Sequence, residues 1–326
     1  MIKNIQLVRT ILAASAIVCT LTGVLAEPIC ADRTIKLVIP QPAGGVGDVV
    51  GRMLADKAST FLGQPIVVEN KVGASTTIGT AAVAAAKPDG CTILHMTNTA
   101  VVASAINNKL PYNLERDLIP VVGVGSFPMA LTVLENSKFK TFVDLVAAAK
   151  SPEGLNYSTG GPGTMAHLAS LRLLKDIGGK GTHVPYRGNA PALQGLLSGD
   201  VHFMFPTTFE AMPLVQASKV RVLGITADAR LPTFSSVPTM KELGFADLTP
   251  RIWYAFLLPA GAKSEVVARV QDAFAKAVID PGIQTQLMAR GFIPEARSTA
   301  DTTAFIKSEY ARWKKVAQEN NISTLD

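Results

Sequence analysis

The chain has 326 residues, of which 48% are hydrophobic, and a formal net charge of +6. It contains no run of basic residues and no basic residues interleaved with aromatic ones, which argues against nucleic acid as a partner. The mild positive charge favours a small anionic ligand over a cationic one. The length exceeds that of one average domain and suits two.

Residues 1–26 have the pattern of an export signal. Two basic residues precede an uncharged apolar stretch at residues 10–25, and small residues lead to a cleavage point after Ala26. The alternative cleavage point follows Ala31. The stretch is shorter than the roughly 20 residues of a membrane span, and no lipid-attachment cysteine stands in the required context. We therefore expect a periplasmic protein whose signal is removed after Ala26, with an uncleaved anchor as the alternative.

Short β-rich runs alternate along the chain with alanine-rich amphipathic segments. This alternation is typical of parallel sheets covered by helices, so we predict an α/β fold. One series of such units reaches about residue 130, a second covers about 131 to 250, and a helical part starts at Lys263. Hinges are expected near residues 127–128 and 250–251. The predicted strands are Ile35 to Ile39, Ile66 to Glu69, Thr92 to Met96, Asn156 to Ser158, His202 to Phe205 and Val220 to Ile225.

A glycine-rich turn from Pro40 to Asp48 lies between the first strand and a helical pattern. The first turn of a helix has unpaired amide donors and the positive end of the dipole, and glycines let a ligand approach the backbone. The turn therefore predicts an anion site. The alternative is a turn that only reverses the chain.

The segment from Ser158 to Thr164 repeats this strand, turn and helix pattern in the second half of the chain. If each domain presents one such helix start, a ligand between them meets two sets of amide donors and two converging dipoles, which suits a carboxylate. A third turn, from Pro185 to Pro191, adds a phenol and a guanidinium.

The last helix has a predicted start and a predicted buried face. Ser298 and Asp301 form a capping box, and an apolar stripe follows at helical spacing. We interpret the stripe as core packing and not as a cofactor site; its members are Ile306, Tyr310, Trp313 and Ala317.

Spaced motifs along nearly the whole mature chain resemble the Bug-type receptors of tripartite tricarboxylate transport systems. The resemblance rests on Leu37-Val38-Ile39-Pro40, Gly44-Gly45 with Asp48, Gly63-Gln64-Pro65 with Val68-Glu69-Asn70, Lys87-Pro88-Asp89-Gly90, Leu110-Pro111-Tyr112, Ser158 to Thr164 with His167-Leu168, His183 to Tyr186 with Gly188, and Val237-Pro238-Thr239.

This resemblance implies a fold and a function. The fold is that of a type II periplasmic binding protein, with two doubly wound α/β domains joined by a two-crossing hinge. Domain 1 takes residues 32–130 and 252–326, and domain 2 takes residues 131–251. The expected function is that of a monomeric extracytoplasmic solute-binding receptor that closes on a small carboxylate and contacts a membrane permease or a sensor.

The resemblance and the turns together indicate a set of ligand-binding residues at the cleft between the domains. Backbone amides near the first turn and groups near the second are expected to hold a carboxylate. The set comprises Gln41, Pro42, Ala43, Gly44, Gly45, Val46, Gly47, Asp48, Ser75, Thr97, Asn98, Ser158, Thr159, Gly160, Gly163, Thr164, Tyr186, Arg187, Gly188 and Pro206.

Two of these residues depart from the family pattern. Gln41 stands where relatives usually have Phe or Tyr over the ligand, so an amide replaces an apolar wall. Pro206 stands where many relatives have Asp, a residue that can face an ammonium group. We therefore expect a carboxylate that lacks an amino group; the alternative is that Pro206 only shapes a loop.

Cys30 and Cys91 occupy places where relatives commonly carry an aromatic residue. They precede the first and third strands, which are neighbours in a doubly wound sheet ordered 2-1-3. Because an exported protein meets an oxidising environment, we predict a disulfide between them. The alternative is two unrelated core residues, and cleavage after Ala31 would remove Cys30.

A secreted hydrolase, with Ser158 as nucleophile and His167 as base, is the main alternative function. The sequence lacks a Gly-x-Ser-x-Gly elbow, and its four histidines are dispersed without the spacing of a zinc site. The glycines at 44, 45 and 47 do not match a nucleotide-binding fingerprint. We therefore expect no enzyme, no cofactor and no metal. A sensory receptor without transport is a further alternative.

Overall fold

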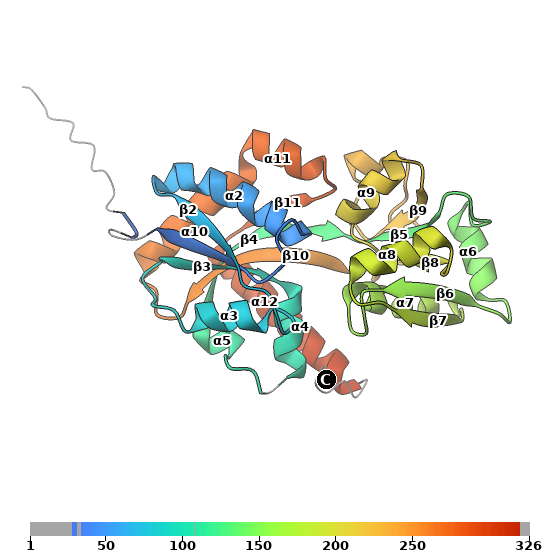
Figure 1. Ribbon diagram of the computed structural model, residues 1–326, viewed down its shortest axis with the longest axis horizontal. Helices are drawn as coiled ribbons and strands as arrows, with labels where there is room; N and C mark the ends of the chain where they lie inside the picture. Colours follow the sequence, from blue (N-terminus) through green and yellow to red (C-terminus); the bar gives the residue numbers. More distant parts are fainter. Residues whose placement is uncertain (1–27, 31–33, 108, 320–326) are drawn as a thin grey trace, which may run out of the picture.

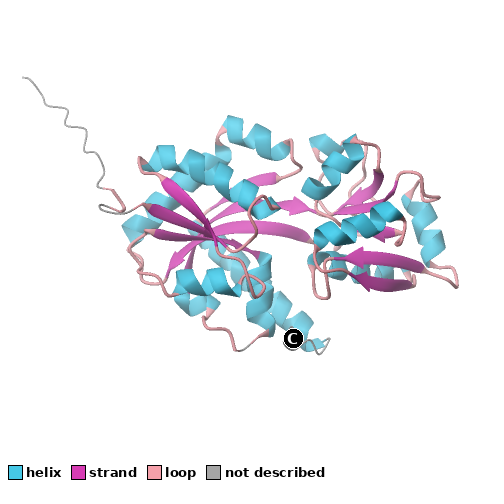
Figure 2. Cartoon of the chain, in the orientation of Figure 1, coloured by secondary structure: helices cyan, strands magenta, loops and turns pink. Residues whose placement is uncertain are grey.

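The structure is a computed structural model of the chain and describes residues 28–30, 34–107 and 109–319. Two sheets, each accompanied by helices, follow one another along the long axis of the molecule (Figures 1 and 2). The predicted two-domain α/β fold is therefore confirmed. The predicted export signal at residues 1–26 and the alternative cleavage point after Ala31 lie outside the described residues.

The first domain is built on a six-stranded sheet in the order β11-β4-β10-β3-β1-β2. β1 lies between β2 and β3 and is parallel to both, which is the 2-1-3 order of a doubly wound sheet. β10 is antiparallel to β3 and β4, and β11 is antiparallel to β4. The strands are β1 Ile35–Ile39, β2 Ile66–Asn70, β3 Thr92–Thr97, β4 Leu118–Pro128, β10 Arg251–Pro259 and β11 Ile293–Arg297.

Helices cover both faces of this sheet, with α2 against α10 on one face and α12 against α4 on the other (Figure 1). The predicted start of α12 is confirmed, because the Ser298 hydroxyl accepts from the Asp301 amide at 3.1 Å. Ile306 and Trp313 of its stripe are buried and Tyr310 packs beside them, while the side chain of Ala317 lies outside the description. The helices are α2 Val46–Leu62, α3 Thr77–Ala84, α4 Asn98–Ile106, α5 Leu114–Asp117, α10 Ser264–Ile279, α11 Pro281–Met288 and α12 Thr299–Glu319.

The second domain is built on a five-stranded sheet in the order β7-β6-β8-β5-β9. β6 is parallel to β7 and β8, whereas β5 is antiparallel to β8 and β9. The strands are β5 Ala130–Leu134, β6 Leu155–Thr159, β7 Gly181–Pro185, β8 Phe203–Met204 and β9 Val220–Ile225. The helices are α6 Phe142–Ala149, α7 Met165–Ile177, α8 Asn189–Ser198, α9 Thr208–Gln216 and the 3₁₀ turn η1 Pro232–Phe234.

The chain passes from the first sheet to the second between β4 and β5, and it returns between β9 and β10. The two passages lie at the predicted hinge positions. The predicted domain limits, 32–130 with 252–326 and 131–251, stay a prediction.

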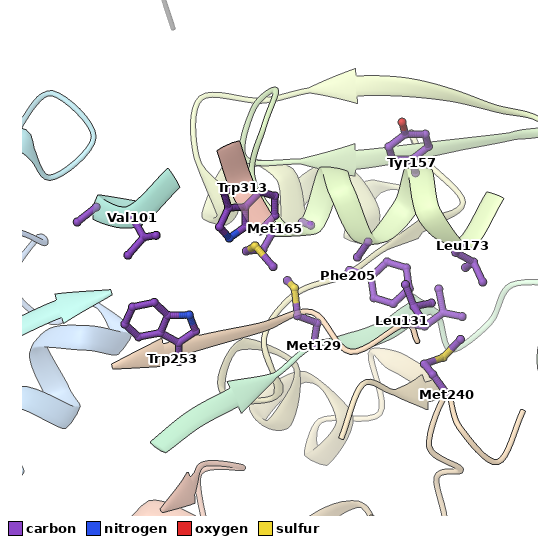
Figure 3. Packing of buried hydrophobic residues seen from close by; sticks show 14 of the residues in the cluster. Val101, Met129, Leu131, Tyr157, Met165, Leu173, Phe205, Met240, Trp253 and Trp313 are labelled. Carbon is purple, nitrogen blue, oxygen red and sulfur yellow. The ribbon is translucent and has the colours of Figure 1, made fainter. Parts of the chain in front are cut away.

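One buried apolar cluster contains residues of both domains. Trp253 and Trp313 of the first domain belong to the same cluster as Met165 of α7, and Met129 at the first passage lies among them (Figure 3). The apolar core therefore continues from one domain into the other at the first passage.

Cys30 and Cys91 meet beside the starts of the neighbouring strands β1 and β3. Their Cα atoms are 5.6 Å apart and their sulfur atoms are in bonding contact, across 61 residues of sequence. Cys91 is in register with the start of β1, because the Lys36 amide donates to the Cys91 carbonyl at 2.9 Å. We propose that the two thiols form a disulfide after export.

Candidate functional site

A cleft of about 520 Å³ is lined by residues of both domains. Its walls come from the turn after β1, the starts of α4, α8 and α9, the turn between β6 and α7, and strand β10. Nine of the residues proposed from the sequence line it: Gln41, Pro42, Gly45, Val46, Ser75, Asn98, Gly160, Gly163 and Thr164.

Asp48 supports the first glycine-rich turn from behind and does not line the cleft. Its buried carboxylate accepts from the Gly44 amide at 2.9 Å and from Asn70 Nδ2 at 2.8 Å, and Arg52 Nε donates to it at 2.9 Å. Burial raises the pKa of this carboxyl, but the hydrogen bonds from Arg52, Asn70 and Gly44 outweigh it and hold the pKa below its usual value. Asp48 is therefore a fixed anion that shapes the turn.

The turn leaves its helix start uncapped at the cleft. Gly45 is the N-cap of α2 and no side chain caps this end, so the amides of Val46 and Gly47 have no acceptor within the described residues. The Gly44 amide is used by Asp48 and the Gly45 amide by the Pro42 carbonyl. The first turn therefore offers the free amide of Val46 to the cleft; Ala43, Gly44 and Gly47 do not line it.

Gln41 lies along the wall of the cleft. Its side-chain oxygen occupies the space in which a Cβ on Gly47 would lie, next to Tyr254, and has no hydrogen-bond partner. The side chain thus points inward against α2, a position that needs glycine at residue 47. Direct contact of Gln41 with a ligand stays a prediction.

Two histidines hold the second glycine-rich turn. The Gly163 amide donates to His167 Nδ1 at 3.1 Å, and His183 Nε2 pairs with the Thr159 hydroxyl at 2.7 Å. The two imidazoles stack with centroids 4.1 Å apart. Burial lowers the pKa of both, and with the neighbouring His183 as a second cause the pKa of His167 falls to about 4. Both rings are therefore neutral at pH 7, as the acceptor role of His167 requires.

The proposed hydrolase pair is not assembled. Ser158 is fully buried and its hydroxyl donates to the Ala192 carbonyl at 2.9 Å. No hydrogen bond joins Ser158 to His167 in the described part of the chain. Ser158 is consequently a structural residue at the end of β6, and the hydrolase alternative loses its nucleophile.

The remaining proposed residues lie beside the cleft without lining it. The Tyr186 hydroxyl folds back over α8 onto Gly195, and Arg187 is exposed to solvent. Thr97 is buried and caps α4 by accepting from the Thr99 amide at 3.2 Å. The other three, Thr159, Gly188 and Pro206, are held by backbone contacts at the turns. A binding role for these six residues stays a prediction.

Several cleft residues escaped the sequence analysis. Glu210 is the one charged side chain among the described residues that line the cleft. Its only sequence signal is the Thr207-x-x-Glu210 capping box of α9. The lining residues outside the proposed set are Thr99, Val102, Ala103, Met129, Gly161, Pro162, Met165, Ala166, Asn189, Thr207, Glu210, Ile252 and Tyr254. Of these, Gly161, Pro162 and Asn189 belong to the predicted turns at 158–164 and 185–191.

Among the described residues, no group of three or more His, Cys, Asp or Glu side chains is placed to hold a metal ion. No helix in this part of the chain has the length and apolar character needed to cross a membrane.

Comparison with known proteins identifies relatives over most of the chain. The model of the "Tripartite tricarboxylate transporter family receptor" matches residues 50–322. A UPF0065 protein of Pseudomonas sp. strain P51, from the tcbD-tcbE intergenic region, is 33% identical over 97% of this chain and 95% of its own length. Protein BugT of Bordetella pertussis is 30% identical over 91% of this chain and 94% of its own length.

Solved structures of similar proteins have the same fold. Rpa4515 of R. palustris, solved with adipate, has a TM-score of 0.79 at 28% identity and covers 90% of this chain and 99% of its own. MatC of Rhodopseudomonas palustris, solved with bound malate, has a TM-score of 0.75 at 29% identity, with coverages of 88% and 99%. The extent of these matches shows that the chain belongs to the tripartite tricarboxylate transporter receptors, the Bug-type periplasmic solute-binding proteins.

Proposed function

We propose that this receptor captures a small carboxylate by closing its two domains and passes it to a membrane transporter. The observation that carries the proposal is the pair of glycine-rich turns, one in each domain, that begin α2 and α7 at the same cleft. Free amides and the positive ends of helix dipoles then face the ligand from both sides.

The composition of the cleft supports anchoring by backbone groups. Neither Lys nor Arg nor His is among the described residues that line it. A carboxylate would therefore be held by neutral donors at helix starts, each end contributing on the order of 0.3–1 kcal/mol or more when shielded from water. The similar proteins MatC and Rpa4515, solved with malate and adipate, bind ligands of this class.

We also propose that the ligand lacks an amino group. Pro206 is buried, and its carbonyl accepts from the Ala130 amide at 2.8 Å, so this position offers no acidic side chain to an ammonium. Tighter binding of aspartate or glutamate than of simple dicarboxylates would contradict this part of the proposal.

The first test is a thermal-shift and calorimetry screen of the mature protein against mono-, di- and tricarboxylic acids. A ligand at one hundred times its dissociation constant should stabilise the fold by about 2.7 kcal/mol, without turnover. Product formation from a carboxylic ester would instead favour the hydrolase. Transfer to reconstituted permease subunits separates a transport receptor from a sensory one.

A proline substitution tests the anchor itself. Val46 is the first residue of α2, where proline fits the backbone but removes the amide donor. We expect V46P to weaken carboxylate binding at least tenfold, whereas V46A, which keeps the amide, retains it. The matched control is S264P at the first residue of α10, away from the cleft, which should leave binding unchanged. Equal binding by V46P and V46A would contradict the anchor.

A further inference from the structure

Glu210 brings a negative charge to the cleft without a cation beside it. Its carboxylate accepts from the Thr207 amide at 2.8 Å, from the Thr207 hydroxyl at 2.9 Å and from Asn189 Nδ2 at 3.1 Å. These three donors are neutral, and no Lys, Arg or His of the described residues forms an ion pair with it. A carboxylate ligand therefore enters a cleft that already holds one negative charge.

This charge sets a condition on the ligand. A ligand that presents only carboxylate and methylene groups to Glu210 meets repulsion, which grows as closure removes water. A carboxylate accepts about four hydrogen bonds, and Glu210 receives three, so one site remains for a donor. A ligand that supplies this donor converts the repulsion into a hydrogen bond to a charged acceptor.

Unpaired polar groups of the first domain line the same cleft. Tyr254 of β10 is only 2% exposed, and its hydroxyl has no partner in the described structure. Burial, and next the charge of Glu210, raise the pKa of this phenol, which keeps it protonated. Asn98 at the start of α4 is also 2% exposed, and its side-chain oxygen has no partner. Glu210 in the second domain and Tyr254 and Asn98 in the first can thus each form a further hydrogen bond with a ligand.

We infer that Glu210 selects, among small carboxylates, those that carry hydroxyl groups along the chain. The inference rests on the proposed capture of a carboxylate and names the class more narrowly, as a hydroxylated carboxylic acid. Tyr254 and Asn98, which line the same cleft from the first domain, complete the preference.

A hydroxyl fits these groups better than an ammonium does. An ammonium would pair with the charge of Glu210, but Glu210 has a single site left, so two of the three N–H donors stay without a partner there, and an ammonium offers no acceptor to Tyr254 or Asn98. The Tyr254 hydroxyl and the Asn98 amide can donate as well as accept, and a hydroxyl matches both roles. The same argument agrees with the proposal that the ligand lacks an amino group.

Glu210 also has a structural role, since it closes the capping box of α9 with Thr207. The chain offers a matched control for this role. Asp144 closes a similar box with Thr141 at the start of α6, and it does not line the cleft. D144N should lower stability about as much as E210Q, because each removes a carboxylate from a capping box. D144N should leave the preference among ligands unchanged.

The experiment is calorimetry on the full mature protein with pairs of acids that differ only in hydroxylation. The pairs are tartrate with succinate and gluconate with hexanoate, and aspartate is the amino counterpart. We expect the hydroxylated member of at least one pair to bind tenfold or more tightly than its partner. E210Q should weaken binding of the hydroxylated acid about tenfold and tighten binding of the unhydroxylated one. The ratio of the two affinities should therefore fall. E210D, which keeps the charge, should keep the direction of the preference.

The outcomes separate this inference from the proposed function. Equal binding within both pairs, tighter binding of aspartate than of tartrate, or an equal loss of both pair members in E210Q would overturn the role of Glu210 while carboxylate capture stands. The absence of binding by any acid in the carboxylate panel would defeat the proposed function, and this inference with it. A changed preference in D144N would show that the effect comes from helix capping.

Discussion

Thr226 and Met129 join the two passages of the chain between the domains. The Met129 amide donates to the Thr226 hydroxyl oxygen at 2.8 Å, and the Thr226 amide donates to the Met129 carbonyl at 3.0 Å. The same hydroxyl donates to the Pro250 carbonyl at 2.6 Å. One buried side chain therefore connects the outgoing passage at residue 129 to the returning one at residue 250, at the hinge on which domain closure depends.

We expect T226V to lower the free energy of unfolding by about 1–3 kcal/mol, because the substitution leaves a buried amide and a carbonyl without partners. Urea denaturation measures the change, and T226S should restore most of it. T132V is the matched control, since Thr132 is equally buried and its hydroxyl donates within one strand, to the Ala130 carbonyl at 2.8 Å. An equal loss in T226V and T132V would contradict a special role at the hinge.

Gly125 is the position in β4 where we expect alanine to be least tolerated. It has φ of +123°, and a Cβ there would overlap the Ile293 carbonyl oxygen of β11. Because backbone strain and overpacking act together, G125A should cost about 3 kcal/mol or more. G178A is the control, since Gly178 has φ of +63° with open space around it and should cost only about 1–2 kcal/mol. Thermal unfolding measures the two losses, and G125A should have the lower melting temperature.

The Cys30–Cys91 pair gives a prediction about the exported protein. Intact mass after periplasmic expression should rise by two hydrogens on reduction, once an N-terminus at Glu27 is verified. The bond closes 61 residues, which in the chain-entropy model contributes about 4 kcal/mol. The C30A/C91A double variant should lose about that amount and become insensitive to reductant. An unchanged mass would rule the bond out.

The lowered pKa of His167 should make the free energy of unfolding depend on pH. Its folded pKa is about 4, below the unfolded value near 6.5. Between these values the unfolded chain binds more protons, so the contribution of neutral His167 is complete above pH 6.5 and is lost as pH falls toward 4. H167N keeps an acceptor for the Gly163 amide and does not titrate. The difference in unfolding free energy between wild type and H167N should be constant above pH 7 and change between pH 6.5 and 4; a difference that stays flat throughout would contradict the assignment.

The local patterns in the sequence were sufficient for several elements. β1 and β9 have the predicted limits, and β2, β3 and β6 extend the prediction by one or two residues. β8 is shorter than predicted, covering only Phe203–Met204. Five strands were not predicted, namely β4, β5, β7, β10 and β11.

The glycine-rich turns of the candidate site were predictable from the sequence, whereas its lining residues on other strands and helices were not. The glycine-rich turns are contiguous in sequence, so both were found and both contribute residues to the cleft. Tyr254 comes from a strand that returns to the first sheet after the whole second domain, and no short-range pattern connects it to residues 41–46. In the sequence, Glu210 looks like an ordinary helix-capping residue. Only the packing of α9 shows that it lines the cleft.

The sequence by itself determined the fold class, the family resemblance and the two helix starts that face the cleft, because each is encoded by residues close together in the chain. The tertiary structure alone decided which residues share the cleft. It showed that Asp48 and Ser158 serve the backbone behind the turns, and it added Glu210 and Tyr254 to the lining of the cleft. The reason is physical: burial and hydrogen-bond partners depend on elements brought together from distant parts of the chain, and they decide whether a polar side chain supports a loop or meets a ligand.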